Sequence, residues 1–136
     1  MNILVIDGHG GMLGAQLVKE ILTRFQNVTV NVVGTNTVAT AAMLKAGAHN
    51  GATGENPVVV GARKADVIIG PIGIVIADSL SGEITPKMAV SVGSADAIRI
   101  LIPMNKCDNM IAGINGTPTS DLIEDVISKL NKITTA

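Results

Sequence analysis

Glycine recurs directly after a short apolar run at the start of the chain. The segment reads MNILVIDGHGGMLG, and Gly8, Gly11 and Gly14 form a GxxGxxG pattern. The stricter GxGxxG pattern would need glycine at position 13, where the chain has Leu13. Glycine lets the main chain turn tightly after a strand, so that a phosphate can reach the unpaired N–H groups at the start of the next helix.

This turn predicts a binding module or sensor for a nucleotide, a dinucleotide or another phosphate-bearing metabolite. The residues expected to contact the ligand are Gly8, His9, Gly10, Gly11 and Gly14. The alternative is a tight turn that binds nothing. NAD and NADP would suit such a turn, but a dinucleotide site usually adds an acidic residue after the second strand, where this chain has Thr35 and Asn36. The pattern therefore leaves the cofactor unknown.

Residues that follow the other predicted strands should border the same crevice, because open α/β sheets bind ligands at the carboxyl ends of their strands. These residues are Thr35, Asn36, Gly73, Asn105 and Lys106. Lys106 would neutralise a phosphate, and Asn105 would bond to a sugar or a base. Thr35 and Asn36 have a second interpretation, since both are residue types that cap helices.

A different hypothesis makes the chain a small-metabolite enzyme that acts through Cys107 or Asp78. A neighbouring cation would have to lower the pKa of the Cys107 thiol, and a lone cysteine is more often an inert apolar residue. Asp78, Ser79 and Glu83 either line a pocket or cap a helix. Asp7 is a base, a ribose acceptor or a partner of the turn amides.

Several familiar sites are excluded by missing residues. Gly14 is followed by Ala15 and Gln16, so the lysine of an ATP-binding P-loop is absent. The glycine spacing resembles that of extended short-chain dehydrogenases, but the chain has no tyrosine for their chemistry. His9 and His49 are not accompanied by an HxxxH or CxxC pattern, and we expect no metal site.

Alternating apolar patterns indicate a strand and helix order typical of an α/β protein. Strands are predicted at 3–6, 28–33, 66–70 and 98–103, with a last short strand at 110–114, and turns at 49–57. Helices are predicted at 13–25, 37–45, 86–92 and 119–133, and residues 58–65 are either a short strand or a helical turn, of which the helical turn is favoured because another strand follows at once. We expect a single Rossmann-like domain over residues 1–136, with three layers and a mostly parallel sheet.

The most apolar segment is VIIGPIGIVIA, at residues 67–77. It is too short to span a bilayer, which takes roughly 20 residues. It is either part of a homodimer interface or a strand that passes directly into a buried helix. If it is an interface, the chain could be a homo-oligomeric interaction subunit that binds no ligand and whose glycine turn is only structural.

The amino-acid composition further limits the classes of partner that we expect the chain to bind. The chain has 136 residues, 47% of them hydrophobic, and a formal net charge of -1, which disfavours nucleic acid and membrane surfaces. Aromatic residues are limited to Phe25, so stacking platforms for bases are missing. With Cys107 as the only cysteine, no internal disulfide can form, and we expect a cytoplasmic protein.

Five blocks of this sequence resemble a short bacterial family that is labelled only as a domain of unknown function. The blocks are IDGHGGMLG, GTNTVATAAMLKAGA, GATGEN, DVIIGPIGIVIADSLSGEITPKMA and ILIPMNKCDN, and the resemblance covers nearly the whole chain. It implies one domain and a prokaryotic source. It implies no activity, substrate or catalytic residue.

Overall fold

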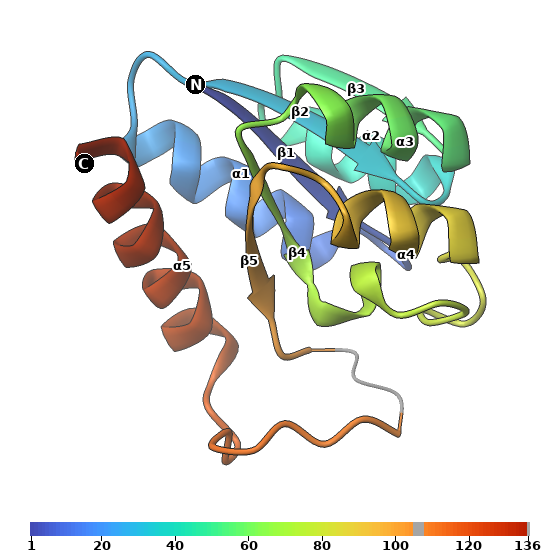
Figure 1. Cartoon of the computed structure of the whole chain (residues 1–136). Coiled ribbons are helices and arrows are strands. Elements are labelled where there is room, and N and C mark those ends of the chain that lie inside the picture. The colour runs from blue at the N-terminus through green and yellow to red at the C-terminus, as the bar shows by residue number, and fades with distance from the viewer. Residues whose placement is uncertain (105–107, 136) are drawn as a thin grey trace.

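Five parallel strands form a sheet in the computed structural model, which describes residues 1–104 and 108–135. The strands are β1 (Asn2–Asp7), β2 (Thr29–Gly34), β3 (Asn50–Thr53), β4 (Val67–Pro71) and β5 (Ile98–Ile102). Their order is β3-β2-β1-β4-β5, so the chain builds one side of the sheet before it crosses to the other (Figure 1). Successive strands are added on one side of β1 up to β3 and on the other side from β4 onward, so the strand order reverses between β1 and β4. Open α/β sheets bind ligands at such a point, at the carboxyl ends of the strands.

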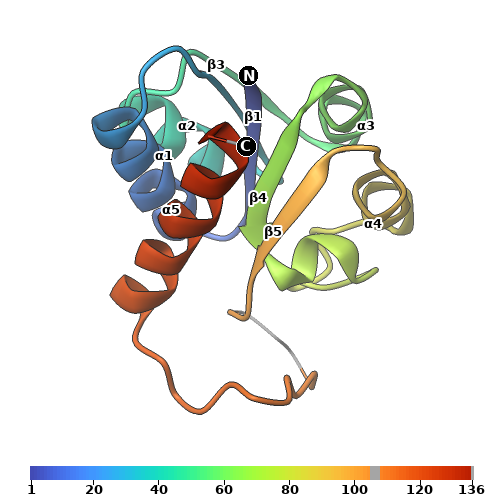
Figure 2. The ribbon, with the colours of Figure 1, turned by 60° about the vertical axis from the view of Figure 1, so that its left-hand side comes forward.

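Helices cover both faces of this sheet. They are α1 (Met12–Arg24), α2 (Thr37–Lys45), α3 (Glu55–Lys64), the short 3₁₀ helix η1 (Ile72–Val75), α4 (Pro86–Gly93) and α5 (Thr119–Thr135). One face carries α1, α2 and α5, and the other carries α3 and α4 (Figure 2). The predicted α/β class, three layers and Rossmann-like parallel sheet are confirmed.

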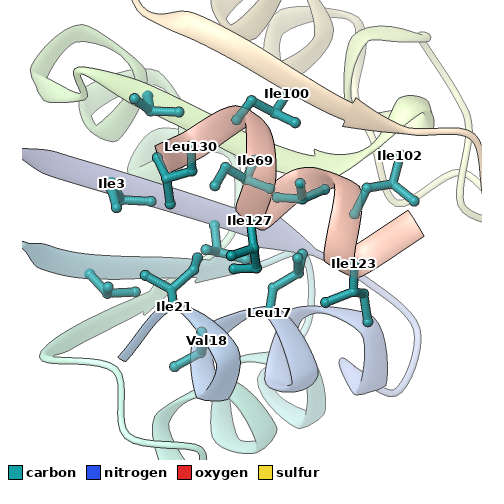
Figure 3. Close-up of a cluster of buried hydrophobic side chains, with 14 of the residues drawn as sticks. Ile3, Leu17, Val18, Ile21, Ile69, Ile100, Ile102, Ile123, Ile127 and Leu130 are labelled. Carbon is teal, nitrogen blue, oxygen red and sulfur yellow. The ribbon is translucent and has the colours of Figure 1, made fainter. Parts of the chain in front are cut away.

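Alternate residues of the same strands build two cores. In β1, Ile3 and Val5 pack against α1 and α5 in the core drawn in Figure 3. Leu4 and Ile6 point to the opposite face and join the core under α3 and α4. A strand buried on both faces is continuously apolar, which explains why the run of residues 3–6 predicts β1 correctly.

The prediction of turns over residues 49–57 is wrong, because β3 lies there and α3 already begins at Glu55. All four residues of β3 are exposed. Among the described residues, this edge strand pairs only with β2, in register from Asn31 with Asn50 to Gly34 with Thr53. Because backbone pairing and not burial holds β3, its sequence NGAT lacks the apolar signal of a strand.

The predicted strand at 110–114 is also wrong. In the described part of the chain, no strand pairs with these residues. Met110 is 97% exposed, and Gly113 has a φ of +87°, which an extended strand does not allow. The apolar residues of this segment therefore lie in an irregular connection between β5 and α5 (Figure 1).

The apolar segment 67–77 is a buried strand that runs into η1. Every residue of β4 is buried, and Ile74 in η1 is fully buried as well. This matches the second of its two interpretations and leaves little of the segment exposed to a partner. Separately, no helix of the described residues is both long and apolar enough to cross a membrane.

Candidate functional site

Asp7 ends β1 and closes the glycine turn from inside. Its buried carboxylate accepts hydrogen bonds from the N–H of Gly8, at 2.8 Å, and from the N–H of Gly14, at 2.7 Å. The N–H of Gly11 donates to the carbonyl of Gly8 at 2.9 Å. Burial raises the pKa of Asp7, and the two N–H donors offset part of this rise. Among its predicted roles, Asp7 is the partner of the turn amides.

Close packing of α1 against α2 accounts for two of the glycines. Gly11 has a φ of +75°, and a Cβ placed on it would lie 2.7 Å from the backbone of Ala39. A Cβ on Gly14 would overlap the sulfur of Met43. Gly10 is different, because its φ lies outside the left-handed region and the nearest atom to a Cβ would be 4.0 Å away. Glycine is therefore a packing requirement at positions 11 and 14 but not at position 10.

The carboxylate of Glu83 lies over the glycine turn. Its Oε1 accepts hydrogen bonds from the N–H of His9, at 3.1 Å, the hydroxyl of Thr35, at 2.5 Å, and the side-chain amide of Asn36, at 3.2 Å. Burial alone would raise the pKa of Glu83, but these hydrogen bonds outweigh it and hold the pKa below its ordinary value. An ionised carboxylate thus fills the space between the ends of β1 and β2.

Thr35 and Asn36 hold Glu83 and organise the start of α2. Asn36 caps this helix, since its Oδ1 accepts from the N–H of Ala39 at 2.9 Å. Its amide also donates to the carbonyl of His9 at 2.9 Å. The capping interpretation is therefore correct for Asn36. The structure brings both residues together with His9 and Gly8, as expected of neighbouring strand ends.

Glu83 is carried by a turn with unusual backbone angles, here called the Glu83 loop (residues 76–84). Asp78, Leu80 and Ser81 have φ between +54° and +65°, and Gly82 has +86°. Positive φ values are energetically unfavourable for residues other than glycine. Leu80 is fully buried and anchors the loop on the core under α3 and α4.

Gly73 does not reach the crevice. It is buried, and a Cβ on it would lie 2.9 Å from the hydroxyl oxygen of Ser79 and 3.5 Å from Leu80. The Ser79 hydroxyl donates to the Gly73 carbonyl. Gly73 therefore seats the Glu83 loop, and the loop leaves it no surface for a ligand in this conformation.

A groove of about 570 Å³ opens between α1 and α5. We call it the α1–α5 groove. At the carboxyl edge of the sheet it is lined by Met12, Leu13, Gln16, Met104, Thr119 and Ser120. The first turns of both helices thus border one end of it. Within the described chain, the N–H groups of Gly10, Met12 and Leu13 donate to no protein acceptor.

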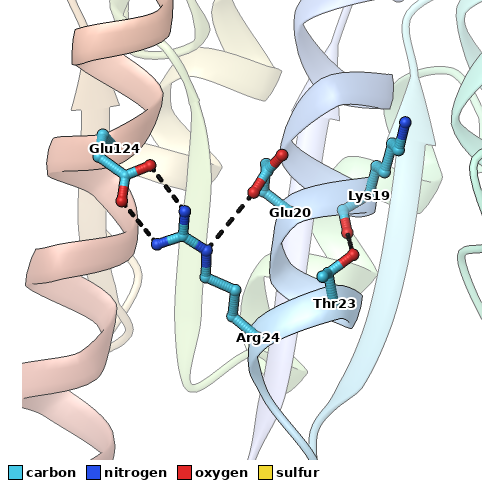
Figure 4. Close-up of polar contacts among 5 residues, drawn as sticks. All are labelled: Lys19, Glu20, Thr23, Arg24 and Glu124. Atoms are coloured by element: carbon cyan, nitrogen blue, oxygen red, sulfur yellow. Dashed lines mark hydrogen bonds and ion pairs between the residues drawn. The ribbon is translucent and has the colours of Figure 1, made fainter.

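An ion pair lies at the other end of the groove. Arg24 donates two hydrogen bonds, of 2.6 and 2.9 Å, to the carboxylate of Glu124, and its Nε lies 3.5 Å from Glu20 (Figure 4). The α1 residue Arg24 is therefore engaged with α5, and among the groove residues it supplies no uncommitted positive charge. The sequence predicts no ligand role for Thr119 and Ser120, although a helix that starts at this edge of the sheet must present its N–H groups there.

The remaining predicted residues divide into two groups. Asn105, Lys106 and Cys107 lie outside the described residues. Asp78 is exposed, and its N–H donates to the carbonyl of Ile84 at 2.7 Å. No cluster of three or more His, Cys, Asp or Glu side chains suited to a metal occurs among the described residues.

Comparison with known proteins finds one family. A family model described as "Domain of unknown function (DUF3842)" matches residues 2–135. A stretch of 87 residues, 63% of this chain, is 36% identical to "Chaperonin GroEL 1" of Mycolicibacterium gilvum (strain PYR-GCK). The match spans only 15% of that chaperonin's length. No solved structure matches the chain significantly.

Proposed function

Because the chain belongs to a family described only as a domain of unknown function, we propose its function from the site itself: it binds a phosphate-bearing small molecule, such as a nucleotide, at the start of α1. The observation that carries this proposal is the set of N–H groups on Gly10, Met12 and Leu13, which have no acceptor within the described chain. Unpaired N–H groups at a helix start attract anions.

The α1–α5 groove supports this proposal by its size and its electrostatics. Its volume of about 570 Å³ falls within the range of roughly 300 to 1,000 Å³ that is usual for small-molecule sites. Two helices, of 13 and 17 residues, begin at the same end of the groove. Their dipoles place positive potential there, which favours the phosphate of a ligand whose remainder lies in the groove.

The proposal differs in one respect from the simplest interpretation of the glycine pattern. The N–H groups of Gly8, His9, Gly11 and Gly14 already have protein acceptors. A phosphate bound in this conformation would use the next N–H groups along the chain, those of Gly10 and the first turn of α1. NAD or NADP as the ligand, a cytoplasmic location and a homodimer stay predictions.

A thermal-shift screen with a dye readout tests the proposal, since the chain has no tryptophan. The probes are inorganic phosphate, pyrophosphate, AMP, ATP, NAD and NADP. A ligand at 100 times its dissociation constant stabilises the folded state by about 2.7 kcal/mol. At least one probe should raise the melting temperature of the wild-type protein.

Gly10→Glu localises the site, because position 10 has room for a side chain and the added carboxylate would repel a phosphate. The matched control is Gly93→Glu, which adds the same charge at an open position of α4, on the opposite face of the sheet. Gly10→Glu should abolish the shift and Gly93→Glu should retain it. Equal shifts in both variants, or no shift in the wild-type protein, would refute the proposal.

A further inference from the structure

The three donors around Glu83 form a site for an oxyanion, here called the oxyanion site: the N–H of His9, the hydroxyl of Thr35 and the side-chain amide of Asn36. We propose that Glu83 is a built-in competitor, whose carboxylate occupies the oxyanion site until an oxyanion of the ligand displaces it. The inference rests on the proposed function, since the oxyanion site adjoins the free N–H of Gly10.

The chemistry of the oxyanion site suits a carboxylate or a phosphate equally. All three donors are neutral and donate to Oε1 of Glu83, and the Asn36 amide also donates to Oε2 at 3.2 Å. Phosphate oxygens accept the same hydrogen bonds as carboxylate oxygens do. A ligand oxyanion that replaced Oε1 would therefore satisfy each donor without further rearrangement of β1 or β2.

Gly8 keeps this space open. A Cβ on Gly8 would lie 2.7 Å from Oε1 of Glu83 and 2.6 Å from the hydroxyl oxygen of Thr35. Its φ lies outside the left-handed region, so the backbone itself does not require glycine. The missing side chain at position 8 makes room for an oxygen atom above the turn, which is the space an oxyanion needs.

The Glu83 loop is suited to release its carboxylate. Asp78, Ser81 and Gly82 are exposed, while Ser79 and Leu80 are buried among them. Three residues other than glycine hold positive φ values in the closed position. Withdrawal of Glu83 would let this backbone relax, which partly offsets the hydrogen bonds that the carboxylate loses.

The test compares the affinity of inorganic phosphate for wild-type protein, Glu83→Gln and Glu83→Ala by isothermal titration calorimetry. Glu83→Ala removes the competitor and should bind phosphate at least tenfold more tightly than wild type. Glu83→Gln keeps the shape of the side chain without its charge, and it should show a smaller gain. Adding Thr35→Val to Glu83→Ala removes one donor and should reverse most of the gain. Circular dichroism checks that each variant is folded.

The outcomes separate this inference from the proposed function. If Glu83→Ala and Glu83→Gln are folded but bind phosphate no more tightly than wild type, the competitor inference is wrong, whatever Gly10→Glu does. A gain that persists in Glu83→Ala/Thr35→Val also overturns it, because the phosphate would then bind elsewhere. If the gain depends on Thr35 but wild-type protein binds none of the screened probes, the donors accept an oxyanion only after Glu83 is removed, and both the displacement of Glu83 by a ligand and the proposed function are wrong.

Discussion

Replacing Gly11 and Gly10 by alanine separates the packing role of the turn glycines from a ligand role. At position 11 the methyl group would meet the backbone of Ala39 at 2.7 Å, and the φ of +75° is unfavourable for alanine. Backbone atoms of α2 cannot rotate away as a flexible side chain can, so α1 and α2 would have to separate. Position 10 lacks both problems, since a Cβ there lies in open space.

The expected magnitudes follow from these two terms. A left-handed conformation costs a residue other than glycine about 1 kcal/mol, and overpacking costs about 1 to 3 kcal/mol. Alanine restricts the unfolded chain and recovers about 0.4 to 1 kcal/mol. Gly11→Ala should therefore lower the free energy of unfolding by about 1 to 3.5 kcal/mol, while Gly10→Ala should leave it unchanged or raise it by about 0.5 kcal/mol.

Urea unfolding measures this difference in the free energy of unfolding between the two variants. Far-ultraviolet circular dichroism follows the unfolding and needs no tryptophan. At about 4 °C per kcal/mol, the melting temperature of Gly11→Ala should fall by about 4 to 14 °C. The unfolding is measured without any phosphate in the buffer, so that a bound ion does not contribute. If Gly11→Ala is as stable as Gly10→Ala, the packing explanation for Gly11 is wrong, and a requirement of ligand binding becomes its better explanation.

Three further predictions concern single side chains. Ser81→Gly should stabilise the protein by up to about 1 kcal/mol in urea unfolding, because Ser81 is exposed with a φ of +56°; a loss of stability would contradict strain in the Glu83 loop. The pKa of Glu83 is held below its ordinary value of 4.5, so its charged form stabilises the folded state above that pH and the contribution disappears as the pH falls through the lowered pKa. The free energies of unfolding of wild type and Glu83→Gln should therefore differ most near neutral pH and converge in acid. The pKa of Asp7 is raised, so the ionisation of Asp7 has the opposite effect on stability, and it does so in both proteins. Arg24→Met should destabilise the protein only slightly, since its bidentate pair with Glu124 is half exposed, and roughly 0.5 M salt should remove most of the difference; an undiminished cost in salt would point to lost packing instead.

The sequence predicts the elements that are recognisable from their own side chains. Residues 3–6 and 67–70 are apolar without interruption because both faces of β1 and β4 are buried. The stripe from Leu122 to Ile133 predicts α5 because this helix buries one face only. By contrast, β3 depends on backbone pairing with β2, which no pattern in NGAT reveals.

The candidate site likewise contains parts that the sequence predicts and a part that it does not. The glycine turn, Thr35 and Asn36 adjoin strand ends, so parallel topology alone brings them to one edge of the sheet. The position of Glu83 depends on a loop whose positive φ values at Leu80 and Ser81 are not typical of those residue types. The residue types allowed Glu83 either to line a pocket or to cap a helix, but they did not indicate that it would reach the end of β2.

This placement makes a strong prediction about position 35. Dinucleotide-binding folds place a ribose-binding acid at the end of the second strand, and here Glu83 supplies a carboxylate 2.5 Å from the hydroxyl of Thr35. If the two positions share one space, Thr35→Asp should put two carboxylates in contact, which cannot both ionise without a penalty. Thr35→Asp should then destabilise the protein at pH 7, and Glu83→Ala should restore most of the loss, with a coupling of about 1 kcal/mol or more in a double-mutant cycle. Additive effects of the two substitutions would mean that the Glu83 carboxylate does not lie at the end of β2 in solution.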